Sequence, residues 1–198
     1  MNQAIVTGAT GFIGARLVNM LLDNNVSVIA LGRKHFRDVD SRRLAHRSNL
    51  QYLKVPMEDI RSLRLEVEKC GLDIGADCVF YNVAWGGVDR LSDMDAMAQS
   101  RNVAQSCFAL EAAAQLGCKK FIHVGTMEEP IAENYLWLDH RRNTEFNRHV
   151  VYSLAKIASR NALKALTSHF DIDVIFATNS HVMGPYDDKD SFLQVTFQ

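Results

Sequence analysis

The sequence predicts a doubly wound α/β domain, in which helices cover both faces of a parallel sheet. Short apolar runs of strand length alternate along the chain with longer segments whose apolar residues recur at helical spacing. The apolar runs contain few polar residues, as expected for parallel strands that are buried on both faces. The first run leads directly into a glycine-rich turn, and later runs end in polar residues, where ligands gather in such sheets.

The glycine-rich turn lies between an apolar run at residues 4–6 and a helical pattern at residues 15–22. Its sequence is Thr7-Gly8-Ala9-Thr10-Gly11-Phe12-Ile13-Gly14. A strand, a glycine-rich turn and a helix in this order suit a dinucleotide pyrophosphate, because the helix N-terminus offers free N–H groups and positive charge. Gly8 permits the tight turn, Gly11 lets the backbone approach a phosphate, and Gly14 lets the helix pack closely on the strand. We assign the turn, with Thr10, Phe12 and Ile13, to cofactor binding; the alternative is a turn that binds no ligand.

The second apolar run, at residues 26–31, ends in Gly32 and Arg33. An acid at this place binds the ribose 2′-hydroxyl of NAD, whereas an arginine accommodates the 2′-phosphate of NADP. Arg37 follows, and the first acid is Asp38. The predicted cofactor is therefore NADP, with NAD as the alternative and Arg33 as the main reader of the phosphate. A solvated basic loop is the other interpretation of these charges.

The remaining elements follow the same alternation. We expect an arginine-rich helix at residues 41–47, a strand at 50–55 and a helix at 60–69, followed by a strand at 78–84 and a long alanine-rich helix at 92–116. A strand at 120–126, a polar loop, a helix at about 152–169 and a strand at 174–178 complete the predicted fold. Trp85, after the fourth strand, either shapes the substrate entrance or packs at the edge of the core.

The fifth strand delivers Thr126 to the ligand-binding edge, and Tyr152 and Lys156 lie one helical turn apart on a later helix. A phenol has a pKa of about 10, but a nearby ammonium and a positive nicotinamide favour the phenolate. Tyr152 can then move a proton on or off a substrate hydroxyl while a hydride passes at the adjacent carbon. The alternative is a helix with one surface lysine and one tyrosine at the edge of the core.

These motifs, in this order, resemble the extended branch of the short-chain dehydrogenase/reductase superfamily, the epimerases, dehydratases and reductases that modify nucleotide sugars on a Rossmann-like fold. Asn82-Val83-Ala84 matches the family's pattern at the end of the fourth strand. The resemblance implies that Asn82 and Ala84 lie near the ribose and nicotinamide of the cofactor. It also implies that Lys156 holds the ribose and that Thr126 hydrogen-bonds the reacting oxygen.

The resemblance implies further roles for three residues. Asn102, in the long helix, corresponds to an asparagine near the active-site backbone, and Asp59 is the remaining candidate for a contact with adenine. Glu128 matches the acid/base glutamate of the dehydratases, although it and Glu129 can equally be solvated acids. Glu128 is therefore a candidate catalytic residue alongside Thr126.

The implied function is that of an NAD(P)-dependent epimerase/dehydratase-type oxidoreductase that acts on a nucleotide-linked sugar. The alternatives are an NADPH-dependent carbonyl reductase and a non-catalytic dinucleotide sensor. The family also implies a homodimer through the long helix and the Tyr152 helix, where small side chains allow close approach at Ala96, Ala98, Ala104 and Ala109. Residues 1–185 form the predicted dinucleotide-binding domain, and residues 186–198 begin a substrate-binding region that is largely absent from this chain, either because the chain is a fragment or because it is a short member.

Composition excludes several other classes of protein. Of 198 residues, 47% are hydrophobic and 23% charged, with a formal net charge of −1, so we expect neither nucleic acid nor a membrane as a partner. The four cysteines lack a Cys-x-x-Cys pair and the seven histidines lack ligand spacing, which predicts no disulfide and no metal site. No signal peptide opens the chain, and a reducing cytoplasm is the expected location.

Overall fold

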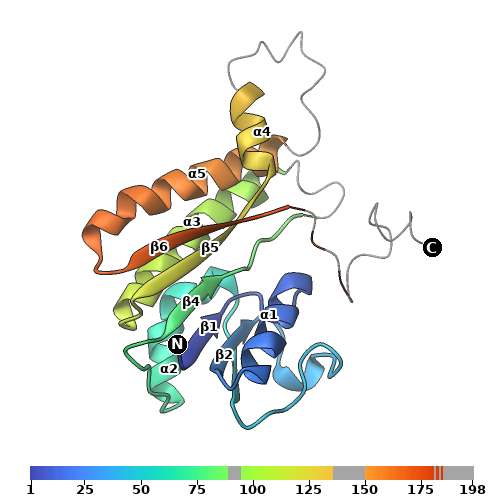
Figure 1. The fold of residues 1–198 in the computed structure, drawn as a ribbon, viewed down its shortest axis with the longest axis vertical. Helices are drawn as coiled ribbons and strands as arrows, with labels where there is room; N and C mark the ends of the chain where they lie inside the picture. Colours follow the sequence, from blue (N-terminus) through green and yellow to red (C-terminus); the bar gives the residue numbers. More distant parts are fainter. Residues whose placement is uncertain (89–94, 136–149, 181, 183, 185–198) are drawn as a thin grey trace, which may run out of the picture.

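The computed structural model describes residues 1–88, 95–135, 150–180, 182 and 184. Its centre is a six-stranded, all-parallel sheet with the order β3-β2-β1-β4-β5-β6 (Figure 1). The strands are β1 (Gln3–Val6), β2 (Ser27–Gly32), β3 (Leu50–Lys54), β4 (Val79–Asn82), β5 (Lys120–Thr126) and β6 (Asp173–Asn179). This order is that of a doubly wound dinucleotide-binding sheet, whose switch point lies between β1 and β4.

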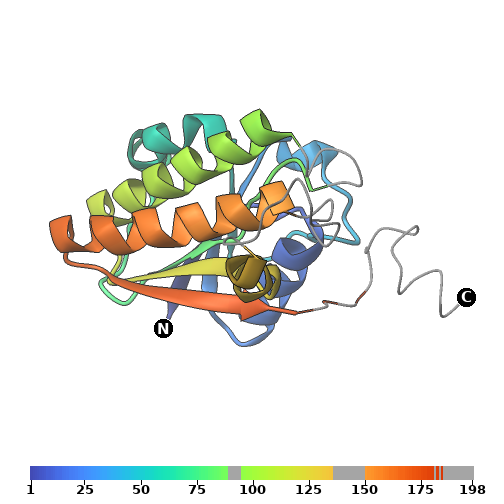
Figure 2. The same cartoon turned by 90° about the horizontal axis from the view of Figure 1, so that it is seen from above.

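Helices lie on both faces of the sheet, as predicted (Figure 2). The helices are α1 (Phe12–Asp23), α2 (Leu63–Lys69), α3 (Ala96–Gln115), α4 (Glu128–Tyr135) and α5 (Val150–Leu166), with short 3-10 turns η1 (Phe36–Asp38), η2 (Met57–Ser62) and η4 (Thr167–His169). α1 lies on one face, and α2, α3 and α5 lie along the other. Of the described helices, none is long and apolar enough to cross a membrane.

Each face of the sheet has its own core. On the α2–α3–α5 face, Phe80 and Phe121 stack with ring centroids 5.3 Å apart, and Leu110 and Leu163 from two helices are fully buried against them. On the α1 face, Val18 packs against alanine and valine residues of β1 and β2. Small strand residues there let α1 approach closely, and this places its N-terminus at the end of β1.

The predicted helix at residues 41–47 is wrong, because the segment forms turns. The Asp40 carboxylate accepts the backbone N–H of Arg42 at 2.9 Å and also binds its guanidinium. Such local side-chain bonds compete with helix formation. Leu44 is buried in the α1-side core, and Asn19 of α1 donates to the carbonyl of Arg43 at 2.7 Å, so tertiary contacts hold the turns in place.

The polar loop predicted after Thr126 begins instead with helix α4. Glu128 and Glu129 occupy its first turn, where negative charge stabilises a helix, and Pro130 is tolerated there because that turn has unpaired N–H groups. The sequence therefore contained the signal for this helix. Residues 136–149, the rest of this predicted loop, lie outside the described residues.

Other boundaries shift by a few residues. The helix predicted at 60–69 begins as the 3-10 turn η2 and becomes α-helical at Leu63. Asp95 caps α3 by accepting the N–H groups of Met97 and Ala98, so the described helix begins after it.

Candidate active site

The glycine-rich turn packs against the end of β4. Gly8 has a φ of +63°, and a Cβ atom there would lie 2.9 Å from the Cα atom of Ala84. A Cβ atom at Gly14 would lie 2.1 Å from the carbonyl oxygen of Gly8. Both glycines are thus required by backbone packing, and this close approach brings the turn to the switch point of the sheet.

The N-terminus of α1 is open to an anion. Its first turn contains no acidic side chain, and no side chain caps the helix at Gly11. A Cβ atom at Gly11 would contact only the carbonyl of Gly8, at 3.2 Å, so packing alone does not demand a glycine there. The turn therefore fits the pyrophosphate of a dinucleotide, since backbone N–H groups at Phe12 and Ile13 begin the helix without a capping partner.

Arg43 is a residue near this turn that sequence reasoning missed. Its guanidinium donates to the carbonyl of Thr10 at 3.0 Å. The bond joins the turn to the segment after β2, over 33 positions of sequence. No local motif predicts it, because the helix expected at residues 41–47 placed Arg43 in a different backbone geometry.

Arg33 is exposed at the end of β2, as the predicted reader of a 2′-phosphate has to be. The backbone beneath it is fixed by Tyr52, whose hydroxyl donates to the carbonyl of Lys34 at 3.0 Å and whose ring stacks on Phe36. Burial raises the pKa of Tyr52, so this residue stays a neutral donor. Asp59, the candidate for a contact with adenine, is exposed in η2.

Asn82 is held at the end of β4 by Thr7. The hydroxyl of Thr7 accepts the backbone N–H groups of Val83 and Ala84, each at 3.0 Å, and donates to Oδ1 of Asn82 at 3.2 Å. The amide nitrogen of Asn82 therefore points the other way, toward Nδ1 of His123 at 3.1 Å. These bonds fix the loop that carries Ala84 against the glycine-rich turn.

His123 in β5 is neutral and continues this network. Burial, and to a smaller extent the nearby charge of Lys156, lower its pKa to about 3. Because Nδ1 accepts from Asn82, the ring proton is on Nε2, which lies 3.3 Å from Oγ of Ser159 in α5. β4, β5 and α5 are thereby joined directly beneath the site, and of the linking residues the sequence had not indicated His123 and Ser159.

Thr126, at the carboxyl end of β5, lies close to Tyr152 and Lys156, which are in the N-terminal half of α5. Thr126 is 9% exposed, and its side chain is near enough to Tyr152 to influence the phenol. Burial raises the pKa of Tyr152, the nearby hydroxyl of Thr126 acts against this, and Glu129 and Glu128 add to the increase. In this structure burial therefore outweighs the lowering of the phenol pKa that we expected from charge.

Lys156 is almost fully enclosed. Its side chain is 3% exposed, and Nζ donates to the carbonyl of Val124 at 2.7 Å. Nζ also lies 3.7 Å from the ring centroid of Trp85 and 5.8 Å from that of Tyr152. Burial lowers the pKa of Lys156 to about 7, and the negative charge of Glu129 acts in the opposite direction.

The structure distinguishes the two glutamates after Thr126. Glu128, the predicted acid/base, is partly exposed, and its backbone N–H donates to Oγ1 of Thr126 at 3.3 Å. Glu129 is 4% exposed, and its Oε1 accepts the backbone N–H of Thr126 at 2.9 Å. Arg160 of α5 pairs with Glu129 at 3.3 Å and also with Glu133. Glu129 therefore supports the backbone of Thr126 through this hydrogen bond, a role that sequence reasoning did not assign.

We expect Glu129→Gln to lower the melting temperature of the protein while Glu128→Gln leaves it nearly unchanged. The first change removes the buried charge that Arg160 neutralises, whereas Glu128 has no such pair among the described contacts. A loss of about 2 kcal/mol corresponds to a decrease of roughly 4–8 °C for a chain of this size. Differential scanning calorimetry of the two variants measures it, and equal melting temperatures would contradict the support role of Glu129.

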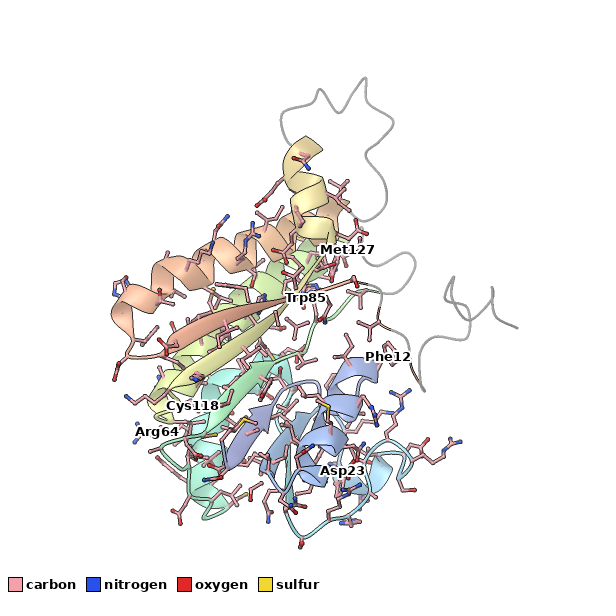
Figure 3. All side chains as sticks on the ribbon, in the orientation of Figure 1. Phe12, Asp23, Arg64, Trp85, Cys118 and Met127 are labelled. Carbon is pink, nitrogen blue, oxygen red and sulfur yellow. The ribbon has the colours of Figure 1, made fainter. Side chains whose placement is uncertain are left out.

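The loop after β4 is attached to α3 by two buried amides. Asn102 accepts the N–H of Gly86 at 3.0 Å and donates to its carbonyl at 2.8 Å, which confirms the expected hydrogen-bonding role of this asparagine. Gln99 donates to the carbonyl of Gly87 at 2.7 Å and accepts the indole N–H of Trp85 at 2.7 Å. Figure 3 shows Trp85, Met127 and Phe12 at the edge where the strands end, and Cys118 on the opposite side.

Among the described residues, the other side chains at this edge form no metal site and no disulfide. Within the described part of the chain, no group of three His, Cys, Asp or Glu side chains could hold a metal ion. The four cysteines are free.

Together, the strand order, the glycine-rich turn at the switch point and the Tyr-x-x-x-Lys helix define the class of doubly wound α/β proteins that bind dinucleotides. The model of the NAD dependent epimerase/dehydratase family matches residues 4–196, and the chain belongs to this family. No curated protein matches the sequence.

Solved structures of nucleotide-sugar epimerases share the fold. The UDP-glucose 4-epimerase of Thermotoga maritima, solved with UDP-glucose, is 18% identical, with a TM-score of 0.69 over 96% of this chain and 59% of its own. The UDP-glucuronic acid 4-epimerase of Bacillus cereus, solved with NAD, is 20% identical, with a TM-score of 0.66 over 97% and 61%. The UDP-glucose 4-epimerase of Thermus thermophilus, solved with NAD, is 17% identical, with a TM-score of 0.70 over 98% and 60%. The chain thus spans about 60% of the length of these proteins.

Proposed function

We propose that this chain carries the cofactor-binding and proton-transfer half of an oxidoreductase of the epimerase/dehydratase type, which acts on a nucleotide-linked sugar. The observation that carries the proposal is the meeting of Thr126, Tyr152 and Lys156 at the sheet edge that also holds the glycine-rich turn. Membership of the family and the fold of the nucleotide-sugar epimerases support the class of substrate.

The turn and the strand ends fit a dinucleotide. The backbone N–H groups of Phe12 and Ile13 would hold the pyrophosphate, Asn82 and Ala84 would border the nicotinamide side, and Arg33 would lie near the adenine ribose. When bound, the nicotinamide supplies a place for a hydride from a carbinol carbon and can return it.

The chain's own residues handle the proton. Tyr152 takes the proton of the substrate hydroxyl while the carbon that bears this hydroxyl loses the hydride, and it returns the proton when that carbon regains the hydride. Alcohol and carbonyl are thereby interconverted. The hydroxyl of Thr126, which is near the phenol, orients the reacting oxygen. The ammonium of Lys156 lies on the inner side of Tyr152 and favours the phenolate once charge develops. Glu128 is the acid/base candidate if the net reaction eliminates water.

Two measurements test this function. Native mass spectrometry of the purified protein identifies a retained cofactor, and a panel of UDP-, GDP- and dTDP-sugars is assayed for epimerised, dehydrated or reduced products. Turnover of a nucleotide sugar supports the proposal. Reduction of simple carbonyl compounds alone favours an NADPH-dependent carbonyl reductase. Binding of the dinucleotide without turnover of either class of substrate favours a sensor.

We expect NADP(H) to bind more tightly than NAD(H), and Arg33→Ala to remove the preference. No carboxylate follows β2 at the place of Arg33, and an exposed guanidinium can pair with a 2′-phosphate. One charge-assisted hydrogen bond of about 1.5–3 kcal/mol gives a roughly ten- to hundredfold preference. Calorimetric titration of both cofactors measures it, with Arg37→Ala as the control, since Arg37 already faces Asp38 at 3.8 Å. Equal affinities in the parent, or an unchanged ratio in Arg33→Ala, would show that Arg33 does not read the 2′-phosphate.

We also propose a homodimer through α3 and α5. Of the small side chains that we named for its interface, Ala109 is 0% exposed in the core and cannot take part, whereas Ala96 and Ala104 are exposed on α3. Light scattering at micromolar concentration is expected to give twice the chain mass, and Ala104→Arg is expected to return it to the monomer mass. A monomer for the parent would contradict the proposal.

The division into a dinucleotide-binding domain at residues 1–185 and the beginning of a substrate region at 186–198 remains a proposal, since residues 185–198 lie outside the described part. A cytoplasmic location also remains a proposal, supported by four free thiols.

A further inference from the structure

Trp85 lies against Lys156, the buried lysine of the site. Nζ of Lys156 stands 3.7 Å from the centroid of the indole ring, and among the described residues it donates one hydrogen bond, to the carbonyl of Val124 at 2.7 Å. An ammonium has three donors, and a side chain that is 3% exposed has little access to water. The negative face of the indole therefore supplies much of what solvent would otherwise give to this cation.

The indole is itself held in place. Its N–H donates to Oε1 of Gln99 at 2.7 Å, and its ring meets that of Tyr152 edge to face, with centroids 6.2 Å apart and planes at 87°. Gln99 is 1% exposed and is fixed in turn by the carbonyl of Gly87. The ring thus presents one defined face to Lys156, and it does so without a cofactor or a substrate.

Other groups near Lys156 do not take over the role of the indole in stabilising the ammonium. His123 of β5 is neutral, because burial lowers its pKa to about 3. Tyr152 of α5 is an uncharged phenol, since burial raises its pKa. Glu129 of α4 is the acid that favours a charged Lys156, and Arg160 pairs with it at 3.3 Å. Burial acts against the cation, so the contact with Trp85 bears on whether Lys156 carries its proton at neutral pH.

We propose that Trp85 is a positioning residue of this site, whose indole face holds the ammonium of Lys156 beside Tyr152 and favours its protonated form. The consequence for catalysis rests on the proposed function, since it matters only if Tyr152 transfers a proton. The contact itself needs neither cofactor nor substrate.

The test changes the charge on the indole face and leaves the shape of the ring nearly unaltered. Mono-, di- and trifluorinated tryptophans are incorporated into a Trp137→Phe background, in which Trp85 is the sole tryptophan. Lysine labelled with ¹³C at Cε is titrated by NMR without cofactor, and the resonance lost in Lys156→Met identifies the residue. The parent midpoint is expected near pH 7. Successive fluorines are expected to lower it, by about one unit in total, because they weaken the attraction between ring and cation.

A midpoint that stays constant across the fluorinated series would overturn the proposal. Trp85→Phe gives a second measurement: a smaller ring with a weaker face is expected to lower the midpoint by less than the full series does. Intrinsic fluorescence of Trp85 in the same background is expected to change with the midpoint of Lys156 and to lose this step in Lys156→Met. A step that persists in Lys156→Met would also count against the contact.

Turnover separates this inference from the proposed function. If the chain transforms no nucleotide sugar and no carbonyl compound, the function fails while the titration still decides the role of Trp85. If turnover is found and the acidic limb of its pH–rate profile does not move with the titration midpoint of Lys156 in the fluorinated series, the ammonium contact has no part in the reaction. A limb that follows the midpoint supports the positioning role.

Discussion

Tyr152→Phe is expected to lower kcat by about a hundredfold or more while the affinity for the dinucleotide stays within about twofold, in line with the usual size of general acid–base catalysis. The change deletes only the hydroxyl near Thr126 that we propose transfers the proton. The ring remains, and with it the edge-to-face contact with Trp85. Steady-state kinetics on a nucleotide sugar that the parent accepts, with calorimetric titration of the cofactor, measures both quantities.

Tyr81→Phe is the matched control for this prediction. Tyr81 lies in β4 and is also half-buried, but its hydroxyl donates only to the sulfur of Met1, at 3.5 Å. Its loss is expected to leave kcat nearly unchanged. If Tyr152→Phe retains parent activity, the proton passes through another group and the assigned chemistry is wrong.

Gly14→Ala is expected to destabilise the protein and to weaken cofactor binding together. The added methyl group would stand 2.1 Å from the carbonyl oxygen of Gly8, which is backbone and cannot rotate away. α1 therefore has to shift on β1, at a cost of about 3 kcal/mol, or roughly 6–12 °C in melting temperature. The same shift moves the N–H groups meant for the pyrophosphate, and the loss of one such bond is worth about tenfold or more in affinity.

Gly75→Ala provides the control for the added methyl group. A Cβ atom at Gly75 would lie 3.4 Å from a carboxylate oxygen of Asp77, an ordinary contact. Calorimetry and cofactor titration are compared for the two variants. Equal behaviour of Gly14→Ala and Gly75→Ala would contradict the assigned packing of the turn.

The fold could be predicted because its signals are local. The strand at residues 120–126 was predicted with the boundaries that the structure shows. The glycine-rich turn could be recognised because its three glycines lie between a strand and a helix. Thr126, Tyr152 and Lys156 were also predicted to lie close together. In a doubly wound sheet, the carboxyl ends of the strands and the amino ends of the helices that follow them share one edge. Family membership confirms the resemblance that these motifs indicated.

Contacts between distant segments were not predictable in the same way. Glu128 and Glu129 are adjacent acids, and only the register of α4 against α5 decides that Glu129 meets Arg160. The helix expected at residues 41–47 failed because Asp40 and a buried Leu44 stabilise turns there. Local propensity is a weak guide wherever tertiary contacts select the backbone.

The sequence by itself determined the order of the six strands along the chain, the place of the glycine-rich turn and the residue types of the candidate site, since each depends on patterns within a few residues. Only the tertiary structure decided the electrostatic environment of that site. Thr7 meets Asn82 over 75 positions, and Lys156 meets the carbonyl of Val124 over 32. The indole of Trp85 covers the same lysine. Burial and long-range pairing of this kind lower the pKa of Lys156 and raise that of Tyr152, and both depend on the packed sheet and helices, which no local pattern contains.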